Sequence, residues 1–439
     1  MSNLTSVAVL ALVACTTGAG SGNDVNPRLI AGGGIGDGPI DGTLNVYAID
    51  AETDAPLANA RVHIGDSADG KLEDSTDEFG LVVFADVRGP QNVSIRLDGY
   101  VPRGWIAVNG ANVTIPMTKL ASATVESAML SGSIPGFDAI QVPSGHLKQA
   151  IVFQSLSGEV FEARNQFSDG VGACFQAGCN WSLRAHTGPV TLTAAIFDID
   201  QQDPTNYYDD TATVIAWATR PSVTVQADVA QSGLALSLIE PGNLQQLTID
   251  LGTPPAGLPR VLPFPLIPID NTVSVQLTVS GSSDLTSPIS VLAPKPSVFG
   301  ASSYRLFAFA DVDQTNQLGY SAVDRSSTSA ALSAGTWMAP PANLAVTRTS
   351  AQWSASSGAK RHRVVYMDAN AKILADLLLF DESQHAVTVP AFLQPSIAGG
   401  GALTALVMEL GTDANPMSFS GAVEADQPYS FGVQTTQVP

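Results

Sequence analysis

Short strand-like runs separated by turn residues dominate this sequence. Segments 43–49, 149–154, 190–197, 213–219, 223–227 and 304–310 are rich in Val, Ile, Ala, Thr and aromatic residues, and no long stretch repeats with a helical period. The 39 Gly and 28 Pro residues supply frequent breaks. With 45% hydrophobic and 14% charged residues the chain can form cores and is unlike a disordered one. We therefore expect an all-β chain of tandem β-sandwich domains.

The first residues look like an export leader. The apolar run Val7–Ala14 is too short to span a bilayer but suits a signal-peptide core. It ends in the letters Leu-Val-Ala-Cys at Cys15, which resembles the lipobox of bacterial lipoproteins. The resemblance implies a signal peptide over 1–14, lipidation of Cys15 and attachment to a membrane through the lipid. Residues 1–5 lack the Lys or Arg usual in such leaders, which puts the true start codon in question.

The residue after the cysteine bears on the destination of the protein. Thr16 stands there, and in lipoproteins the absence of Asp at this position favours the outer membrane, at its periplasmic face or at the cell surface. Residues 15–41 are rich in Gly, Ser, Thr and Asn and include a Gly-rich run at 32–38. Such a composition cannot bury a core, so we interpret 15–41 as a flexible tether.

Residues 42–120 carry a recognisable order of turn and strand residues. The order is Asp50, Thr53-Asp54, Pro56-Leu57-Ala58-Asn59-Ala60, Val62, Thr76-Asp77-Glu78-Phe79-Gly80, Phe84 and Gly99-Tyr100. It resembles the carboxypeptidase regulatory-like domains, which share a transthyretin-like sandwich and serve as spacers or interaction modules without catalytic residues. Asp54 and Asn59 replace glycines of the family pattern, and both residue types tolerate left-handed turns. We expect Val46, Val62, Phe84 and Tyr100 in the core.

The middle region contains one partial repeat. Residues 195–201, Ala-Ile-Phe-Asp-Ile-Asp-Gln, resemble residues 308–314, Ala-Phe-Ala-Asp-Val-Asp-Gln, and the offset of about one sandwich domain divides the region near Pro241. We therefore predict two sandwiches of no identified family, over 121–240 and 241–338. The four-residue gap between Cys174 and Cys179 predicts a small disulfide-closed loop in an exported protein.

The acidic residues after the strand at 190–197 are the best ligand candidates. Asp198, Asp200 and Asp203, with Asp209 and Asp210 nearby, could offer carboxylate oxygens to Ca²⁺. The stretch is not an EF-hand loop, because the invariant Gly and terminal Glu are missing. The alternative is a solvated acidic turn at the end of an apolar strand. No other cofactor is expected.

Residues 339–439 resemble a fibronectin type III-like sandwich. The features are Pro341-Ala342-Asn343-Leu344, Trp353 in a strand and Gly358-Ala359 before the next strand. The core Tyr of the family, nine positions after the Trp, is replaced by His362. The cluster Lys360-Arg361-His362-Arg363 could meet an acidic partner, or could be a solvated strand edge.

Charge and motifs limit the possible functions. Twenty basic residues against 40 acidic ones, a net charge of −20, repel phosphate backbones and make nucleic acid an unlikely partner. No catalytic motif stands in a suitable setting, so we predict a non-enzymatic surface protein that acts in binding or adhesion, with a protein or polysaccharide ligand. The alternatives are a structural spacer or envelope component and, less favoured, a glycoside hydrolase using carboxylates on a β scaffold. Exposed tryptophans would favour sugar binding. The sequence leaves ligand and oligomeric state open.

Overall fold

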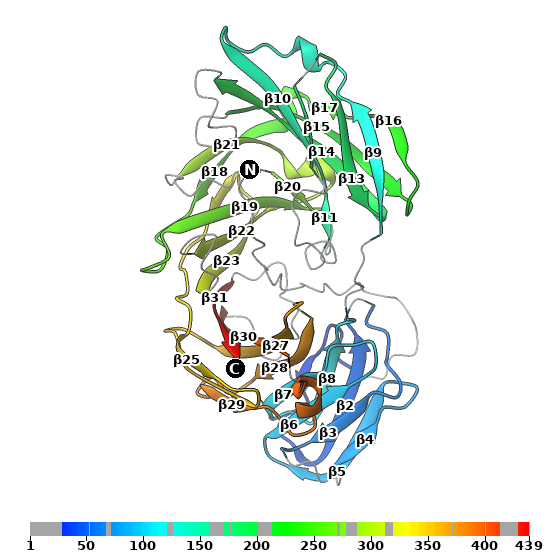
Figure 1. Ribbon diagram of the computed structural model, residues 1–439, viewed down its shortest axis with the longest axis vertical. Coiled ribbons are helices and arrows are strands. Elements are labelled where there is room, and N and C mark those ends of the chain that lie inside the picture. The colour runs from blue at the N-terminus through cyan, green and yellow to red at the C-terminus, as the bar shows by residue number, and fades with distance from the viewer. Residues whose placement is uncertain are drawn as a thin grey trace. The chain divides into compact units, whose positions relative to one another are not determined.

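The structure is a computed structural model that describes residues 29–51, 53–66, 72–120, 126–157, 171–175, 177–200, 213–269, 273–277, 288–311, 319–370, 372–399, 401–412 and 429–438. Strands dominate these residues, which confirms the all-β prediction (Figure 1). The helices among these residues are short: α2 (Gln394–Ile397) and the 3-10 turns η1 (Phe137–Ala139), η2 (Pro241–Asn243) and η3 (Pro296–Phe299). In the described part of the chain, none could cross a membrane.

The chain forms two compact units that do not follow its linear order. The middle unit contains residues 122–314 and 322–337, and the terminal unit contains residues 12–121, 315–321 and 338–439. The first and last predicted domains therefore belong to one unit, and the two middle ones belong to the other. The finer division into four sandwiches at the predicted boundaries stays a prediction.

The N-terminal part of the terminal unit contains two sheets, whose strands we name the first sandwich. One sheet has the order β1 (Gly34–Gly36), β8 (Asn112–Met117), β2 (Asp41–Asp50), β5 (Leu81–Arg88). The interpretation of 15–41 as a flexible tether is therefore wrong for its last part, because β1 pairs with β8 and Ile35 and Ile40 are buried. The neighbouring strands of the other are β7 (Arg103–Val108), β6 (Gln91–Arg96), β3 (Arg61–Ile64) and β4 (Glu73–Ser75). Strand β5 alternates as an amphipathic strand should, with Val82 and Phe84 buried and Val83 exposed.

The turn chemistry expected from the sequence is present in the first sandwich. Asp54 (φ 55°) and Asn59 (φ 61°) adopt the left-handed backbone that glycine usually supplies. Gly80 also has positive φ (70°), and a Cβ there would lie 2.6 Å from the Ala48 carbonyl oxygen. The expected core residues Val46, Val62 and Phe84 are buried. Tyr100 is half-buried and donates its hydroxyl to Asp50 Oδ2 at 2.8 Å.

The C-terminal part of the terminal unit, which we name the last sandwich, also contains two sheets. One has the order β25 (Ala342–Val346), β26 (Ser350–Ser354), β29 (Ala386–Thr388). The neighbouring strands of the other are β31 (Tyr429–Val438), β30 (Leu403–Thr412), β27 (Arg361–Asp368) and β28 (Ile373–Leu379). Trp353, His362 and Tyr366 are buried in this sandwich, so His362 does occupy a core position.

A parallel pairing of β28 with β7 joins the first and last sandwiches into one sheet (Figure 1). Leu377 lies opposite Gly104, and Leu378 lies opposite Trp105. The sheet therefore continues in the order β31-β30-β27-β28-β7-β6-β3-β4. A Cβ at position 104 would lie 2.7 Å from Leu377 Cδ2, so glycine permits the close packing here.

The middle unit has four groups of neighbouring strands. The first group has the order β12 (Val171–Cys174), β10 (His146–Gln154), β14 (Gly188–Asp200), β15 (Thr213–Val225), β17 (Ser237–Leu238). The second group has the order β13 (Asn180–His186), β9 (Ser127–Ser133), β16 (Gln231–Ala235). The third group has the order β11 (Leu156–Ser157), β20 (Val273–Gln276), β19 (Arg260–Pro268), β22 (Tyr304–Asp311), β23 (Gly319–Ser327). The fourth group has the order β21 (Ile289–Pro294), β18 (Leu244–Asp250), β24 (Ala331–Ser333).

One detail of the middle unit differs from the sequence-based expectation. Runs 213–219 and 223–227 looked like separate strands, but 213–225 is the single strand β15. A register shift between Val190 and Leu192 of the partner strand β14, together with the positive φ of Ser222 (58°), accommodates Pro221 without ending the strand.

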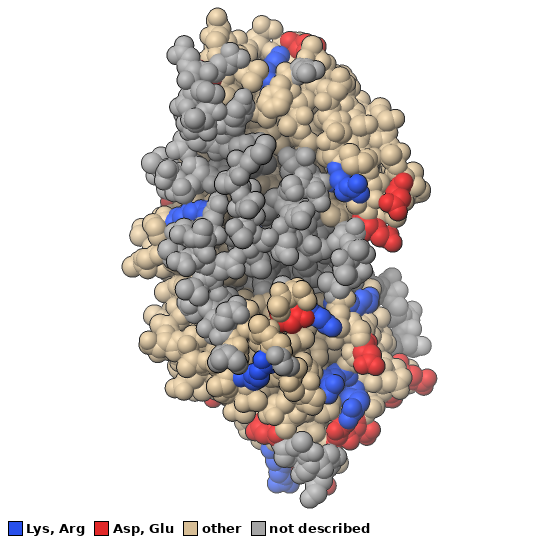
Figure 2. Space-filling model, in the orientation of Figure 1, with Lys and Arg blue, Asp and Glu red and all other residues tan. Residues whose placement is uncertain are grey.

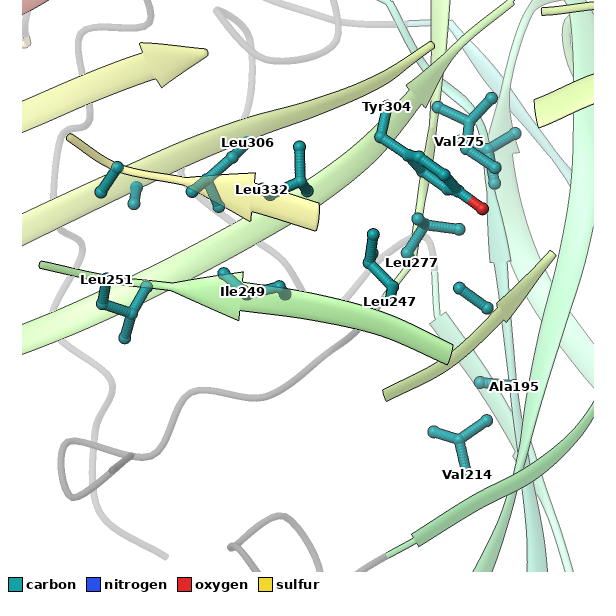
Figure 3. Packing of buried hydrophobic residues seen from close by; sticks show 14 of the residues in the cluster. Ala195, Val214, Leu247, Ile249, Leu251, Val275, Leu277, Tyr304, Leu306 and Leu332 are labelled. Carbon is teal, nitrogen blue, oxygen red and sulfur yellow. The ribbon is translucent and has the colours of Figure 1, made fainter. Parts of the chain in front are cut away.

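The middle unit is organised around a core shared by both of its sequence halves. Figure 3 shows Ala195 and Val214 from the first half in the same cluster as Leu247, Leu277 and Tyr304 from the second. Trp217 Nε1 donates to the Leu292 carbonyl at 2.7 Å, which adds a polar contact between the halves. Such a shared core makes the two halves of the middle unit interdependent.

Candidate functional site

Two of the predicted site residues lie outside the described residues. These are Cys15, the predicted lipidation site, and Asp203, the third of the predicted calcium ligands. Both predictions stand as they were made from the sequence.

The predicted disulfide is present between Cys174 and Cys179, whose Cα atoms are 5.1 Å apart. Cys174 ends the edge strand β12, and Cys179 precedes β13. Both are buried in a core cluster that includes Trp181. The loop between them is fixed from outside by Asp138, whose carboxylate accepts the Gly178 N–H at 3.0 Å. The disulfide therefore fastens an edge strand to the core.

The remaining predicted calcium ligands, Asp198 and Asp200, lie at the end of β14. Asp198 Oδ1 contacts His146 Nδ1 at 2.8 Å, because β10 runs antiparallel to β14 and brings His146 to this end of the pair. The two residues are 52 positions apart in the sequence, and only the strand register reveals their contact. In the described part of the chain, no group of three or more His, Cys, Asp and Glu side chains is placed to hold a metal ion. Calcium binding remains a prediction.

The corresponding motif in the second half of the middle unit also ends a strand. Asp311, which the repeat aligns with Asp198, is the last residue of β22, whereas β14 continues two residues past Asp198 to Asp200. Asp311 Oδ2 lies 3.9 Å from Arg260 Nη1 of the neighbouring strand β19. The partial sequence repeat thus places one aspartate at or near a strand end in each half, Asp198 beside His146 and Asp311 beside Arg260. This feature fits electrostatic pairing as well as it fits metal binding.

A buried ion network lies where β28 meets β7. Asp376 is 3% exposed and accepts hydrogen bonds from Arg363 Nε at 2.7 Å, Arg363 Nη2 at 2.8 Å and Arg103 Nε at 3.1 Å. Burial opposes ionisation of Asp376, but the two guanidinium groups outweigh it and hold its pKa below the ordinary value. Arg103 also donates to the Pro116 carbonyl and to Thr118 Oγ1. One carboxylate therefore links three strands of the terminal unit.

A second buried acid organises the last sandwich. Glu409 is fully buried and receives hydrogen bonds from Trp353 Nε1 at 3.0 Å and from the Ser356 N–H at 2.7 Å, and also from the Ser356 hydroxyl. His362 Nδ1 is 3.3 Å from Glu409 Oε1. Burial raises the pKa of Glu409, but the contacts from His362 and Ser356 outweigh it and lower the pKa overall. Ser356 donates to the acid and not to His362, so this Ser, His and Glu arrangement lacks the hydroxyl-to-imidazole contact that activates a serine nucleophile.

The exposure of the five tryptophans tests whether the protein has a sugar-stacking surface, and the structure describes all five. Trp105, Trp181, Trp217, Trp337 and Trp353 are between 0% and 8% exposed. Trp217, Trp337 and Trp353 also use their indole N–H groups in internal hydrogen bonds. The tryptophans are therefore core residues, and none forms a platform on which a sugar ring could stack.

The charged side chains on the visible face are mixed in sign. Figure 2 shows Lys and Arg interspersed with Asp and Glu on the coloured atoms, without a large basic track. The cluster at 360–363 does not behave as one exposed basic patch either, since Arg361 and His362 are buried and Arg363 binds Asp376. A polyanion therefore finds no continuous basic surface on this coloured face.

Comparisons with known proteins do not identify a family. No protein-family model matches the sequence, and no curated protein does. Among solved structures, the chain is similar to the TIE protein of Bacillus anthracis, at 12% identity and a TM-score of 0.16 over 62% of this chain and 45% of that one. A minor pilin of Streptococcus agalactiae matches at 9% identity and 0.15, over 46% and 97% of the two chains. A DUF3823 family protein of Parabacteroides merdae matches at 9% and 0.13, over 72% and 100%. Similarities this weak support no conclusion, so the fold assignment rests on the strands themselves.

Proposed function

We propose that this chain is a lipid-anchored surface protein that acts by non-catalytic binding, with the middle unit as its binding module and a protein as its ligand. The observation that carries the proposal is the pairing of β28 with β7, which closes the terminal unit across the whole sequence. The chain leaves that unit after residue 121 and has returned to it by residue 338. A spacer built only of successive domains does not need its last domain to pair with its first.

Two further features bear on the alternatives. One favours a protein ligand over a polysaccharide, and the other favours binding over a hydrolase activity. The tryptophans that would stack on sugar rings are used in the cores. The buried acids Asp376 and Glu409 are engaged by arginine, histidine, indole and serine donors. Asp376 and Glu409 are buried as well as engaged, so these two acids are not accessible to a substrate.

Anchoring is tested by comparing the wild type with Cys15→Ser. We expect the wild-type protein to fractionate with membranes and to show cleavage before Cys15 with added acyl mass by mass spectrometry. Cys15→Ser should lose both properties. Processing and membrane attachment of Cys15→Ser at wild-type levels would overturn the lipid anchor.

Binding is tested with cells that carry the intact protein and with cells that carry a variant in which a Gly-Ser linker replaces residues 126–311. Both should be anchored, but only the intact protein should promote adhesion of the cells to each other or to a protein-coated surface. Equal adhesion by the two would exclude the middle unit as the binding module. Adhesion that is abolished by soluble polysaccharide and is insensitive to protease treatment of the target would exclude a protein ligand.

Calcium binding by Asp198, Asp200 and Asp203 is a subsidiary proposal. Extracellular Ca²⁺ sites have dissociation constants on the order of 10⁻⁴ to 10⁻³ M, so even a weak site would fill outside the cytoplasm. Bound ion would raise the melting temperature by mass action. Melting curves in Ca²⁺, Mg²⁺ and NaCl at matched ionic strength, repeated on Asp198→Asn/Asp200→Asn, provide the test. Equal effects of the three salts would reduce the residues to an acidic turn paired with His146.

A further inference from the structure

Strand β5 is an end strand of its sheet with exposed apolar side chains. In the described part of the chain, the order β1-β8-β2-β5 places no strand beside β5 on the side away from β2. Val82 and Phe84 are buried in the sandwich, whereas Val83 is 51% exposed and Ala85 is also exposed. An exposed apolar edge strand is a template for pairing with another chain. The edge of β5 is therefore a candidate docking surface.

The other end strands of the first sandwich are less suited to such pairing. Strand β4, which ends the second sheet, begins with Glu73 and Asp74, and charged residues on an edge oppose the addition of a strand. Strand β1, at the opposite end of the first sheet, has only three residues, and two of them are glycine. Among these three end strands, β5 alone combines length with exposed apolar side chains.

The direction of the backbone groups of β5 follows from the contacts at its start. The Gly80 carbonyl accepts a hydrogen bond from a residue of β2, so it faces β2. Leu81 faces the other way, because its carbonyl accepts the Asp77 N–H and its own N–H donates to Asp77 Oδ1, both at 2.9 Å. Successive residues of a strand direct their backbone groups to alternate sides. The N–H and C=O groups of Val83 and Ala85 therefore point away from β2.

Two local features limit pairing to Val83 and Ala85. Before them, Asp77 already occupies the preceding outward position. After them, Asp86 has a positive φ of 58°, and the register between β2 and β5 shifts there. Such a bulge bends the strand and ends regular pairing. An incoming strand therefore gains backbone hydrogen bonds at these two residues and at no further position along β5.

We propose that β5 is a self-association edge, at which the β5 strands of two copies pair antiparallel about a two-fold axis at Phe84. Val83 of each copy then lies opposite Ala85 of the other, so every outward backbone group of both residues acquires a partner. The exposed side chains of these two residues pack against each other across the axis. A second copy is the occupant because the segment is complementary to itself, and a two-fold contact is closed, which limits the assembly to a dimer.

The strength of this contact is limited by its length and by charge. Two copies of net charge −20 repel each other, but at physiological ionic strength the repulsion is screened beyond about 8 Å. We expect a dissociation constant on the order of 10⁻⁴ to 10⁻³ M for copies in solution. Copies attached to one membrane meet at higher local concentration, as linked modules do, so dimerisation at the surface rests on the proposed lipid anchor.

Crosslinking in solution tests the pairing without relying on the anchor. The full chain with Cys15→Ser has no other free thiol, because Cys174 and Cys179 are bonded. Val83→Cys and Ala85→Cys are made in this background, mixed and oxidised. Opposite residues of a hydrogen-bonded antiparallel pair have Cα atoms about 5.5 Å apart, within disulfide range, whereas two copies of the same residue lie on a diagonal of about 7–8 Å. We expect the mixture to form linked dimers about tenfold faster than either variant alone.

Random collision sets the background rate of this reaction. Val83→Cys mixed with Met129→Cys measures it, because Met129 is an exposed residue of the middle unit, at 42%. A mixture of Val83→Cys and Ala85→Cys that links no faster than this control would overturn the proposal.

Sedimentation of the Cys15→Ser chain without added cysteines measures the association directly. Val83→Lys places a charge on the edge and should weaken dimerisation at least tenfold, to a degree that thermal melting shows is not due to unfolding. Val229→Lys, at a 48% exposed position of the middle unit, is the matched control and should leave dimerisation unchanged. Equal effects of the two substitutions would contradict pairing through β5. So would a parent chain that stays monomeric up to concentrations on the order of 10⁻³ M.

Discussion

Replacing Asp376 with Asn tests whether one buried carboxylate holds the first and last sandwiches together. The substitution leaves Arg103 and Arg363, whose side chains are 8% and 13% exposed, without their shared anion. Removing one partner of a buried ion pair costs about 3–5 kcal/mol, because the remaining charge stays desolvated. That is a large share of the 5–15 kcal/mol typical of a folded domain. We expect the terminal unit of Asp376→Asn to unfold at clearly lower urea concentration than the wild type.

The pH dependence of the same variant provides an independent check. The folded-state pKa of Asp376 is depressed, so its contribution to stability is present above the unfolded pKa, about 3.9, and is lost as pH falls through the folded value. The wild-type terminal unit should therefore lose stability steeply below about pH 4, and Asp376→Asn should show a shallower acid limb.

Urea titrations between acidic and neutral pH, followed by tryptophan fluorescence and by proteolysis of the terminal unit, measure both effects. Asp41→Asn is the matched control, since its side chain is 83% exposed and its contact with Arg88 spans 3.6 Å. It should change the free energy of unfolding by less than about 1 kcal/mol. A similarly small loss in Asp376→Asn, with an unchanged acid limb, would refute the view that the network joins the two sandwiches.

Three other substitutions test the same physical account. Glu409→Gln should lower the free energy of unfolding of the last sandwich by about 1–3 kcal/mol. It should also flatten the fall of stability at acidic pH, because the depressed pKa makes the Glu409 contribution vanish as pH falls. Urea titrations at several pH values measure both effects, and an unchanged fall of stability at acidic pH would contradict the second. Gly80→Ala should lower the melting temperature, since φ is 70° and the added Cβ meets the Ala48 carbonyl; a higher melting temperature would disprove the clash. Cys174→Ser/Cys179→Ser should cost only about 2 kcal/mol in the middle unit, because the closed loop is short. Thiol labelling of the non-reduced wild type should find neither cysteine free.

Local structure was readable from residue type and spacing. The runs at 43–49 and 190–197 predicted β2 and β14, because Val, Ile, Thr and aromatic side chains pack well on the pleated surface of a sheet. Asp54 and Asn59 could stand for glycines because their side chains tolerate left-handed backbone. The separation of five residues between Cys174 and Cys179 was enough to predict their bond, since the chain itself holds them close.

The partners of each strand were decided only in the tertiary structure. Alternation reports that a face is buried but carries no information about which strand lies beside it, so the pairing of β28 with β7 across most of the sequence gave no local signal. For the same reason no local pattern in the sequence indicated that Asp376 meets Arg103 or that His146 meets Asp198. The composition and turns of this chain determine that it is built of β-strands. The register between distant strands determines which of its charged groups meet, because those contacts depend on long-range packing that no local pattern in the sequence reveals.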